Sequence, residues 1–167
     1  MARKVLRTAA VPVKSDEGQA LVEFALVAVV FLTLVFGIID FARLFESWVT
    51  VQHAARQGAR YALTGRSDCD EYTDNRVGCI IFEAKQASVG LTGTPDDVDV
   101  SVRSWSYPAY ADPPAEGSPG DACDAIEVQV DYDHQIMTPL VAQIIDHVPL
   151  RGRERVLNEP FGPCGGS

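Results

Sequence analysis

An almost unbroken apolar run from Ala20 to Ile39 is the strongest pattern in the chain. At about 1.5 Å per residue, a helix of this length matches the roughly 30 Å hydrocarbon core of a bilayer. Lipid offers no partners to open backbone groups, so a spanning segment here must be helical. The run contains two strongly polar residues, Glu23 and Thr33. A carboxylate at membrane depth costs about 3 kcal/mol, so Glu23 is either a functional residue or an interfacial acid that the helix dipole favours.

After the run, apolar residues recur every three or four positions, which predicts that the same helix continues to about Leu63. Gly37 and Gly58 are candidate bends, and Gly65 is a candidate stop. We expect one face of this half to pack on the rest of the protein and the other face to be solvated. The apolar face comprises Phe41, Leu44, Phe45, Trp48, Val51, Ala55, Ala59 and Ala62; the polar face comprises Arg43, Glu46, Ser47, Thr50, His53, Arg56, Gln57 and Arg60.

Residues 64–167 predict a small α+β head. Apolar residues at helical spacing indicate a short helix over about 80–90, which ends at a glycine. Valines then alternate with polar residues over 98–103, which predicts a strand that extends towards Tyr107.

A stricter alternation over 126–133 predicts a second strand, and 150–157 predicts a third. Between them, Thr138 and Pro139 are typical of a helix start, and we expect a short helix through Ile145. Prolines and glycines over 108–120 predict an irregular loop. The expected fold is therefore a long helix followed by a head with a short helix and a roughly three-stranded antiparallel sheet.

The residues before the apolar run favour processing at its start. An ordinary secretory signal has a shorter apolar core followed by small residues at a cleavage point, and no such site follows this run. Gly18 followed by Gln19, with Glu23 as the fifth residue after the glycine, resembles the prepilin-peptidase site of type IV pilin-like proteins. That resemblance implies cleavage between Gly18 and Gln19 on the cytoplasmic side, so that residues 1–18 form a removed basic leader.

Three stretches extend the resemblance: Ala20-Leu21-Val22-Glu23-Phe24-Ala25-Leu26-Val27, Phe36-Gly37-Ile38-Ile39-Asp40-Phe41-Ala42-Arg43-Leu44 and His53-Ala54-Ala55-Arg56-Gln57-Gly58-Ala59-Arg60-Tyr61-Ala62. Together they resemble the TadE-like family. An Asn158-Glu159 pair near the C-terminus is similar to the family's terminal strand, although Leu157 stands where an arginine is expected.

The family implies a minor pilin or pseudopilin with a type IV pilin-like fold, which takes part in assembly of a tight-adherence (Flp-type) pilus and in adhesion. In pilin-like filaments, a carboxylate at the place of Glu23 pairs with the N-terminal amine of a neighbouring subunit, and Phe24 lies beside it in the assembly segment. The implied partners are the bilayer, prepilin peptidase and other pilus subunits. Alternatives are a single-span binding or accessory module that never polymerises, a type II secretion pseudopilin and a membrane-tethered hydrolase.

Charge argues for the orientation of the chain. Four Lys or Arg residues precede the span, whereas Arg43 and Arg56 follow it within about 20 residues, so the positive-inside rule predicts N-in, C-out topology in the inner membrane. The net charge is -9, and removal of residues 1–18 takes away four bases and two acids, which leaves -11. An acidic chain of this kind is a poor nucleic-acid binder.

Four cysteines, Cys69, Cys79, Cys123 and Cys164, would then lie in an oxidising compartment, where an even number favours two disulfides. Zinc is the rival, but no C-x-x-C pair occurs. Antiparallel pairing of the second and third strands places Cys123 beside Cys164, which leaves a local bridge between Cys69 and Cys79.

The sequence predicts no enzyme, no cofactor, no metal and no small-molecule substrate. The three histidines are scattered, and neither a nucleophile elbow nor a phosphate-binding glycine loop is present. Asp131, Asp133 and His134 could bind a metal, but strand alternation places the two acids on the solvent face. Asp96, Asp97 and Asp99 could offer oxygen ligands to calcium, but the glycine and glutamate of a complete loop are missing.

Overall fold

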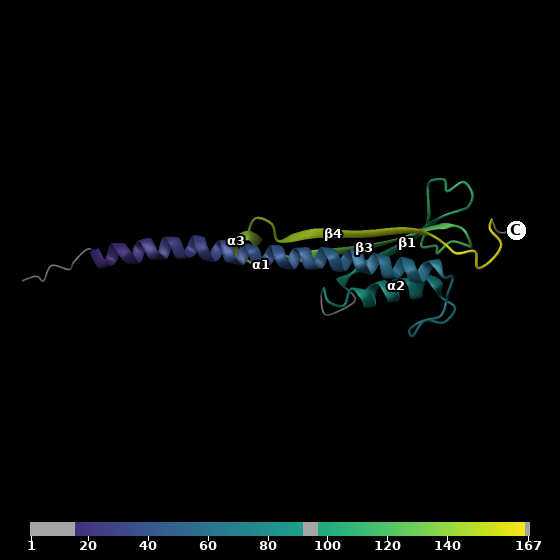
Figure 1. The fold of residues 1–167 in the computed structure, drawn as a ribbon, viewed down its shortest axis with the longest axis horizontal. Helices are drawn as coiled ribbons and strands as arrows, with labels where there is room; N and C mark the ends of the chain where they lie inside the picture. Colours follow the sequence, from purple (N-terminus) through teal and green to yellow (C-terminus); the bar gives the residue numbers. More distant parts are fainter. Residues whose placement is uncertain (1–15, 92–96, 166–167) are drawn as a thin grey trace, which may run out of the picture.

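The structure is a computed structural model that describes residues 16–91 and 97–165. The bases of the leader and Asp96 lie outside the described residues. A single helix, α1 (Asp16–Leu63), dominates the molecule with 48 residues, which corresponds to about 72 Å. The head lies along the C-terminal half of α1, and the N-terminal half projects from it alone (Figure 1).

The head contains an antiparallel sheet with the strand order β2-β1-β3-β4. Its members are β1 (Asp99–Trp105), β2 (Ala115–Glu116), β3 (Ala125–Gln135) and β4 (His147–Leu157). The α+β architecture is therefore confirmed. The sheet has four strands rather than three because two residues of the proline-rich loop pair with Arg103 and Ser104 at the edge of β1.

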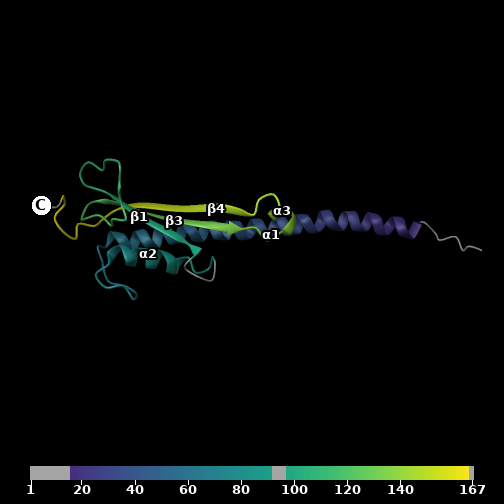
Figure 2. The ribbon, with the colours of Figure 1, turned by 180° about the vertical axis from the view of Figure 1, so that it is seen from behind.

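The two longer helices pack on one face of this sheet. α1 lies along β3 and β4, while α2 (Arg76–Ala87) contacts α1 and β1, as the two opposite views show (Figures 1 and 2). The predicted alternation is confirmed, since Val100 and Val102 on β1 face Val130 and Val128 on β3 within the core. These side chains meet the small residues Ala54, Ala55, Ala59 and Ala62 of α1.

Two glycines permit the close contact between α1 and the sheet. A Cβ atom on Gly152 of β4 would lie 2.5 Å from the carbonyl oxygen of Val51, so only glycine allows the strand to approach the helix backbone there. A Cβ atom on Gly58 would lie 3.0 Å from a methyl carbon of Val128 and 3.1 Å from Ala84. Gly58 therefore serves helix packing, where the sequence suggested a bend.

The predicted packing face of α1 is wrong in one part. Val51, Ala55, Ala59 and Ala62 are buried, but Phe41, Phe45 and Trp48 are exposed. Polar residues at the same level are buried in their place, namely Asp40 and Ser47. Asp40 and Ser47 thus turn towards the head, because the hairpin that reaches this part of α1 offers them two polar partners, the Thr138 N–H and the His134 ring.

Several element boundaries also differ from expectation. α2 begins at Arg76, where the Asn75 side chain caps it by accepting from the Gly78 N–H at 2.9 Å, and it ends before Gly90. The helix expected through Ile145 is the single turn α3 (Pro139–Ala142). β4 begins at His147, earlier than predicted, because its pairing with β3 reaches from Leu157 opposite Ala125 to His147 opposite Gln135.

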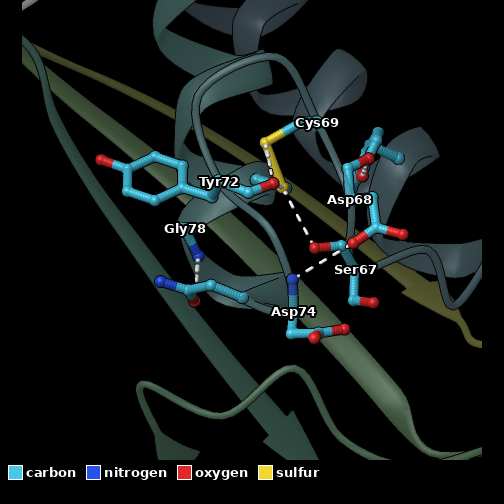
Figure 3. Close-up of a disulfide and its surroundings, with 9 residues drawn as sticks. Ser67, Asp68, Cys69, Tyr72, Asp74 and Gly78 are labelled. Atoms are coloured by element: carbon cyan, nitrogen blue, oxygen red, sulfur yellow. Dashed lines mark hydrogen bonds between the residues drawn. A yellow bond between two sulfur atoms is a disulfide. The ribbon is translucent and has the colours of Figure 1, made fainter.

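The end of the head farthest from the N-terminus of α1 holds both disulfides. Cys69 is bonded to Cys79 and Cys123 to Cys164, which is the predicted connectivity. The first bridge joins the loop after α1 to the first turns of α2, where Cys69 also donates its backbone N–H to the Tyr72 carbonyl at 2.9 Å (Figure 3).

A second set of contacts ties this distal end to the C-terminal segment. Arg76 donates to the carbonyl of Gly120 at 2.6 Å and to that of Ala62 at 2.7 Å. Asn158, which is buried, donates its side-chain amide to two carbonyls of the loop before β3, and the Glu159 N–H donates to the Leu63 carbonyl at the end of α1. The Asn-Glu pair noted in the sequence is thus a structural clamp.

Candidate functional site: the exposed N-terminal half of α1

The candidate processing residues lie in the first turns of α1. The helix begins at Asp16, so Gly18 lies in the first turn, where backbone N–H groups lack helical partners, and Gln19 follows directly. A Cβ atom on Gly18 would meet nothing within 4 Å. Folding of this chain therefore places no demand for glycine at position 18, and helix ends open at little cost in free energy.

Glu23 lies one turn after Gln19 on the same face of the helix. The Gln19 side-chain amide donates to a carboxylate oxygen of Glu23 at 3.1 Å. This is a local contact between residues four apart, and no hydrogen bond or ion pair joins Glu23 to the described residues of the head. Phe24, the other candidate assembly residue, is exposed. The acid is thus satisfied once within its own helix and still has acceptor capacity for a second partner.

The apolar half of α1 has no cover from the head. This helix is the one candidate span among the described residues, and none of its most apolar window is buried. A core helix of a soluble protein would be covered, whereas here Leu21, Val22, Phe31, Leu34 and Ile38 all keep about half or more of their surface open. Exposure of so large an apolar surface requires lipid or partner helices around it.

Exposed aromatic residues continue this surface beyond the apolar run. Phe41, Phe45 and Trp48 are 70%, 56% and 46% exposed, and the rings of Phe45 and Trp48 lie 5.8 Å apart. Their spacings of four and three continue a row through the span, so we call them the aromatic strip. The full row comprises Phe24, Val27, Phe31, Leu34, Ile38, Phe41, Phe45 and Trp48, all of them exposed.

The structure also shows a buried polar contact that sequence reasoning did not identify. The Ser47 hydroxyl lies 3.0 Å from Nδ1 of His134 on β3, beside a hollow of about 570 Å³. Burial lowers the pKa of His134, and the nearby Arg43 guanidinium lowers it further, while Asp40 opposes the shift. A neutral imidazole hydrogen-bonded to a serine suits this enclosed position. Periodicity could not reveal it because Ser47 reads as part of a solvated helix face.

Asp40 forms the other unforeseen contact. One of its carboxylate oxygens accepts from the backbone N–H of Thr138 at 3.0 Å, which joins α1 to the hairpin between β3 and β4. Asp40 is buried although it directly follows the apolar run. This carboxylate therefore holds the tip of the hairpin at the point where the candidate span ends.

The predicted site residues fall into two distant groups. Gly18, Gln19, Glu23 and Phe24 belong to the first turns of α1, which lie at one end of the molecule (Figure 1). The two disulfides of the four cysteines join segments of the head that follow the other end of α1. Among residues 16–91 and 97–165, no group of three His, Cys, Asp or Glu side chains could hold a metal ion. Asp131 makes an ion pair with Arg151, and Asp133 is exposed.

Comparison with known proteins bears on the N-terminal group. No curated protein and no solved structure matches the chain. A model of the family described as TadE-like protein matches residues 18–60, which begin at the candidate processing site and include the apolar run and the aromatic strip. Residues 18–60 of the long helix are therefore similar to the TadE-like family, as the sequence motifs predict.

Proposed function

We propose that this protein is a minor pilin-like subunit that takes part in assembly of a tight-adherence, Flp-type pilus. The observation that carries the proposal is the coincidence of the TadE-like match, residues 18–60, with the part of α1 whose apolar surface the head leaves open. The helix is long and apolar enough to anchor the chain in the inner membrane. The disulfides favour an extracytoplasmic position for the head.

In this proposal, prepilin peptidase cleaves between Gly18 and Gln19. The open space around Gly18 supports the idea that the glycine serves the peptidase, which must approach the backbone closely, rather than the fold. Cleavage would give Gln19 a free amine one helical turn from the Glu23 carboxylate. Between two subunits, the amine of one and the carboxylate of another would offset the cost that each charge has alone in lipid.

The aromatic strip supports packing of the helix against other pilus subunits. Within the bilayer, lipid alone can cover an apolar helix, but Phe41, Phe45 and Trp48 lie after the run that fills the hydrocarbon core. A row at alternating spacings of three and four is the pattern by which helices interlock side by side. The row thus provides a surface for neighbouring long helices inside and outside the membrane.

Mass spectrometry of the protein extracted from membranes tests the processing step. We expect the mature chain to begin at Gln19, and we expect Gly18→Trp to retain the leader. Gly18→Trp should still fold, because the site has no neighbours to displace. Gly90→Trp, at another glycine with open space around it, is the matched control and should be cleaved normally. An intact leader on the native protein would contradict the proposed processing.

Incorporation into sheared pili tests the role of Glu23. Glu23→Gln should insert in the membrane and lose its leader, yet reach filaments in reduced amount because the amine has lost its charged partner. Glu46→Gln removes the same charge from an exposed position farther along α1 and should leave incorporation unchanged. If the native protein is processed but fails to co-purify with the major pilin, a non-polymerising anchored accessory module replaces the proposal.

A further inference from the structure

The hairpin tip between β3 and β4, residues 136–146, has a composition unlike that of an ordinary surface loop. Asp146 is its one charged residue, whereas the rest of the tip is largely apolar. Surface connections are normally polar, since they face water. The apolar residues of the tip are Ile136, Met137, Leu140, Val141, Ala142, Ile144 and Ile145.

Three of these apolar side chains are open to the surroundings. Ile144 is 83% exposed, Met137 is 65% exposed and Ile145 is 52% exposed. The tip itself is well ordered by its backbone: the Ile136 N–H donates to the Asp146 carbonyl at 3.0 Å, and the N–H groups of Ile144 and Ile145 both donate to the Val141 carbonyl. An organised turn thus presents large apolar groups that the head does not bury.

The hairpin tip lies level with the end of the candidate span. Thr138 is hydrogen-bonded to Asp40, the residue immediately after the apolar run. A groove of about 300 Å³ between the tip and α1 is lined by Phe36, Ile39, Asp40, Arg43, Met137 and Thr138. The apolar surface of the tip is therefore continuous with that of the last turn of the run.

We propose that the hairpin tip inserts into the outer-leaflet interface of the bilayer and forms a second, peripheral membrane contact of the head. The inference rests on the proposed membrane anchoring of α1. When residues 20–39 fill the hydrocarbon core, Asp40 and the tip lie at the headgroup level, where exposed isoleucine and methionine side chains can enter the acyl boundary. Arg43, which is exposed at the same level and contacts the Met137 sulfur through one guanidinium nitrogen, can offer its other N–H groups to lipid phosphates.

A lipid surface fits this tip better than a protein partner does. Its position is set by the span of the same chain, so lipid meets the tip as soon as α1 is inserted, before any other subunit is present. The two contacts together, one through α1 and one through the tip, would hold the head at one fixed tilt. They would also present the aromatic strip in a single orientation above the membrane.

Tryptophan quenching in proteoliposomes of the full-length chain tests the inference. The probes are Ile144→Trp and Met137→Trp, and the matched control is Leu157→Trp, because Leu157 is 60% exposed at the opposite end of β4. Emission in excess of that from the native Trp48 and Trp105 reports on the new side chain. Lipids brominated near the headgroup end of the acyl chains, or near the chain ends, act as quenchers of different depth.

We expect the added emission of Ile144→Trp and Met137→Trp to be quenched, more strongly by bromine near the headgroups than by bromine at the chain ends. Leu157→Trp should respond to neither lipid and should be quenched by aqueous iodide. Equal access of iodide to Ile144→Trp and Leu157→Trp would overturn the inference. Protection of Ile144→Trp from both bromine and iodide would also overturn it, because a protein surface would then cover the tip.

Carbonate extraction of the same vesicles separates this inference from the function on which it rests. If the chain resists extraction but the two probes are not quenched, the tip contact is wrong and the anchored pilin-like function stands. If the native chain is extracted from the membrane, both the anchoring and the tip contact are wrong.

Discussion

The two ends of the head are stabilised in different ways. The distal end holds both disulfides, the Arg76 contacts and the buried Asn158, so loops far apart in sequence are linked there by disulfides and by hydrogen bonds. The proximal end, which lies beside the end of the candidate span, has no disulfide among the described residues. There the hairpin tip meets α1 through the Thr138 N–H and the Asp40 carboxylate.

This difference matches the surroundings that the two ends are expected to have. An end that faces water outside the cell has irregular loops and few buried apolar side chains. Such an end needs cross-links, which lower the conformational entropy of the unfolded chain. An end beside a bilayer can leave apolar residues exposed, because lipid covers them. The head is thus a sheet whose distal end is cross-linked by disulfides and whose proximal end exposes apolar side chains. Between the two ends, the sheet packs on the alanines of α1.

The largest expected effect comes from removing the Cys123–Cys164 disulfide at the distal end. Cys123→Ser with Cys164→Ser opens a bridge between residues 41 apart, for which the chain-entropy relation gives about 4 kcal/mol. The local Cys69 and Cys79 bridge spans 10 residues and gives about 3 kcal/mol. Denaturant unfolding of the detergent-solubilised chain measures both losses. Equal or reversed losses would contradict the view that the longer bridge dominates the distal end.

Gly152→Ala tests the close contact between β4 and α1. The added methyl group would lie 2.5 Å from the Val51 carbonyl oxygen, so α1 and β4 must separate, at a cost of about 2–3 kcal/mol. Gly90→Ala is the control, since its added methyl group meets no atom within 4 Å. The same unfolding measurement should show the loss for the first variant only. Equal stability of the two variants would mean that the helix is not pressed against the strand.

Asp40→Ala tests the proximal end alone. It leaves the Thr138 N–H without its acceptor, which costs about 1–3 kcal/mol locally. Hydrogen exchange of amides 136–146 should accelerate about tenfold or more, while exchange around Cys123 stays unchanged. Asp40→Asn keeps an acceptor oxygen and should show a smaller change. Acceleration at both ends would show that the head has no independent proximal contact.

The sequence predicted those parts of the molecule that local pattern determines. The apolar run, the alternation of 126–133 and the glycine after Leu63 each depend on near neighbours, so α1, β3 and the helix end appear where expected. The disulfide pairing followed because antiparallel strands bring their opposite ends together. Gly18, Gln19 and Glu23 form a sequence motif, so the candidate site could be identified from the sequence before the fold was known.

What the sequence could not show depends on tertiary position. Phe41 and Ser47 have the spacings of a buried and a solvated face, but the hairpin tip reaches α1 from the polar side and reverses their burial. The closeness of Gly152 to Val51 joins residues about 100 apart, and no periodic pattern encodes it. The exposure of Ile144 was likewise not predictable, because an isoleucine side chain is ordinarily expected to be buried in the core.

Acidification gives the smallest expected effect, and it also acts on the proximal end. Burial holds the pKa of His134 below its usual 6.5. At a pH between this lowered pKa and 6.5, the unfolded chain therefore binds a proton more readily than the folded chain. Stability should therefore fall as the pH decreases below about 6.5, and this contribution should be absent at higher pH. Unfolding midpoints at about pH 7.5 and about pH 5.5 measure the change.

His134→Gln separates this residue from the other titrating groups of the chain. Glutamine cannot take up a proton in this range, so the variant should lose part of the pH dependence. His53→Gln, at an exposed position of α1, is the control for replacing a histidine elsewhere in the chain. The charged groups that act on His134 are Arg43 and Asp40, both on α1 beside the hairpin. Protonation of His134 would add a positive charge next to Arg43 and remove the acceptor that the neutral ring can offer to Ser47. The proximal contact should thus weaken in acid while the disulfide-linked distal end, which has no titrating thiols, keeps its stability.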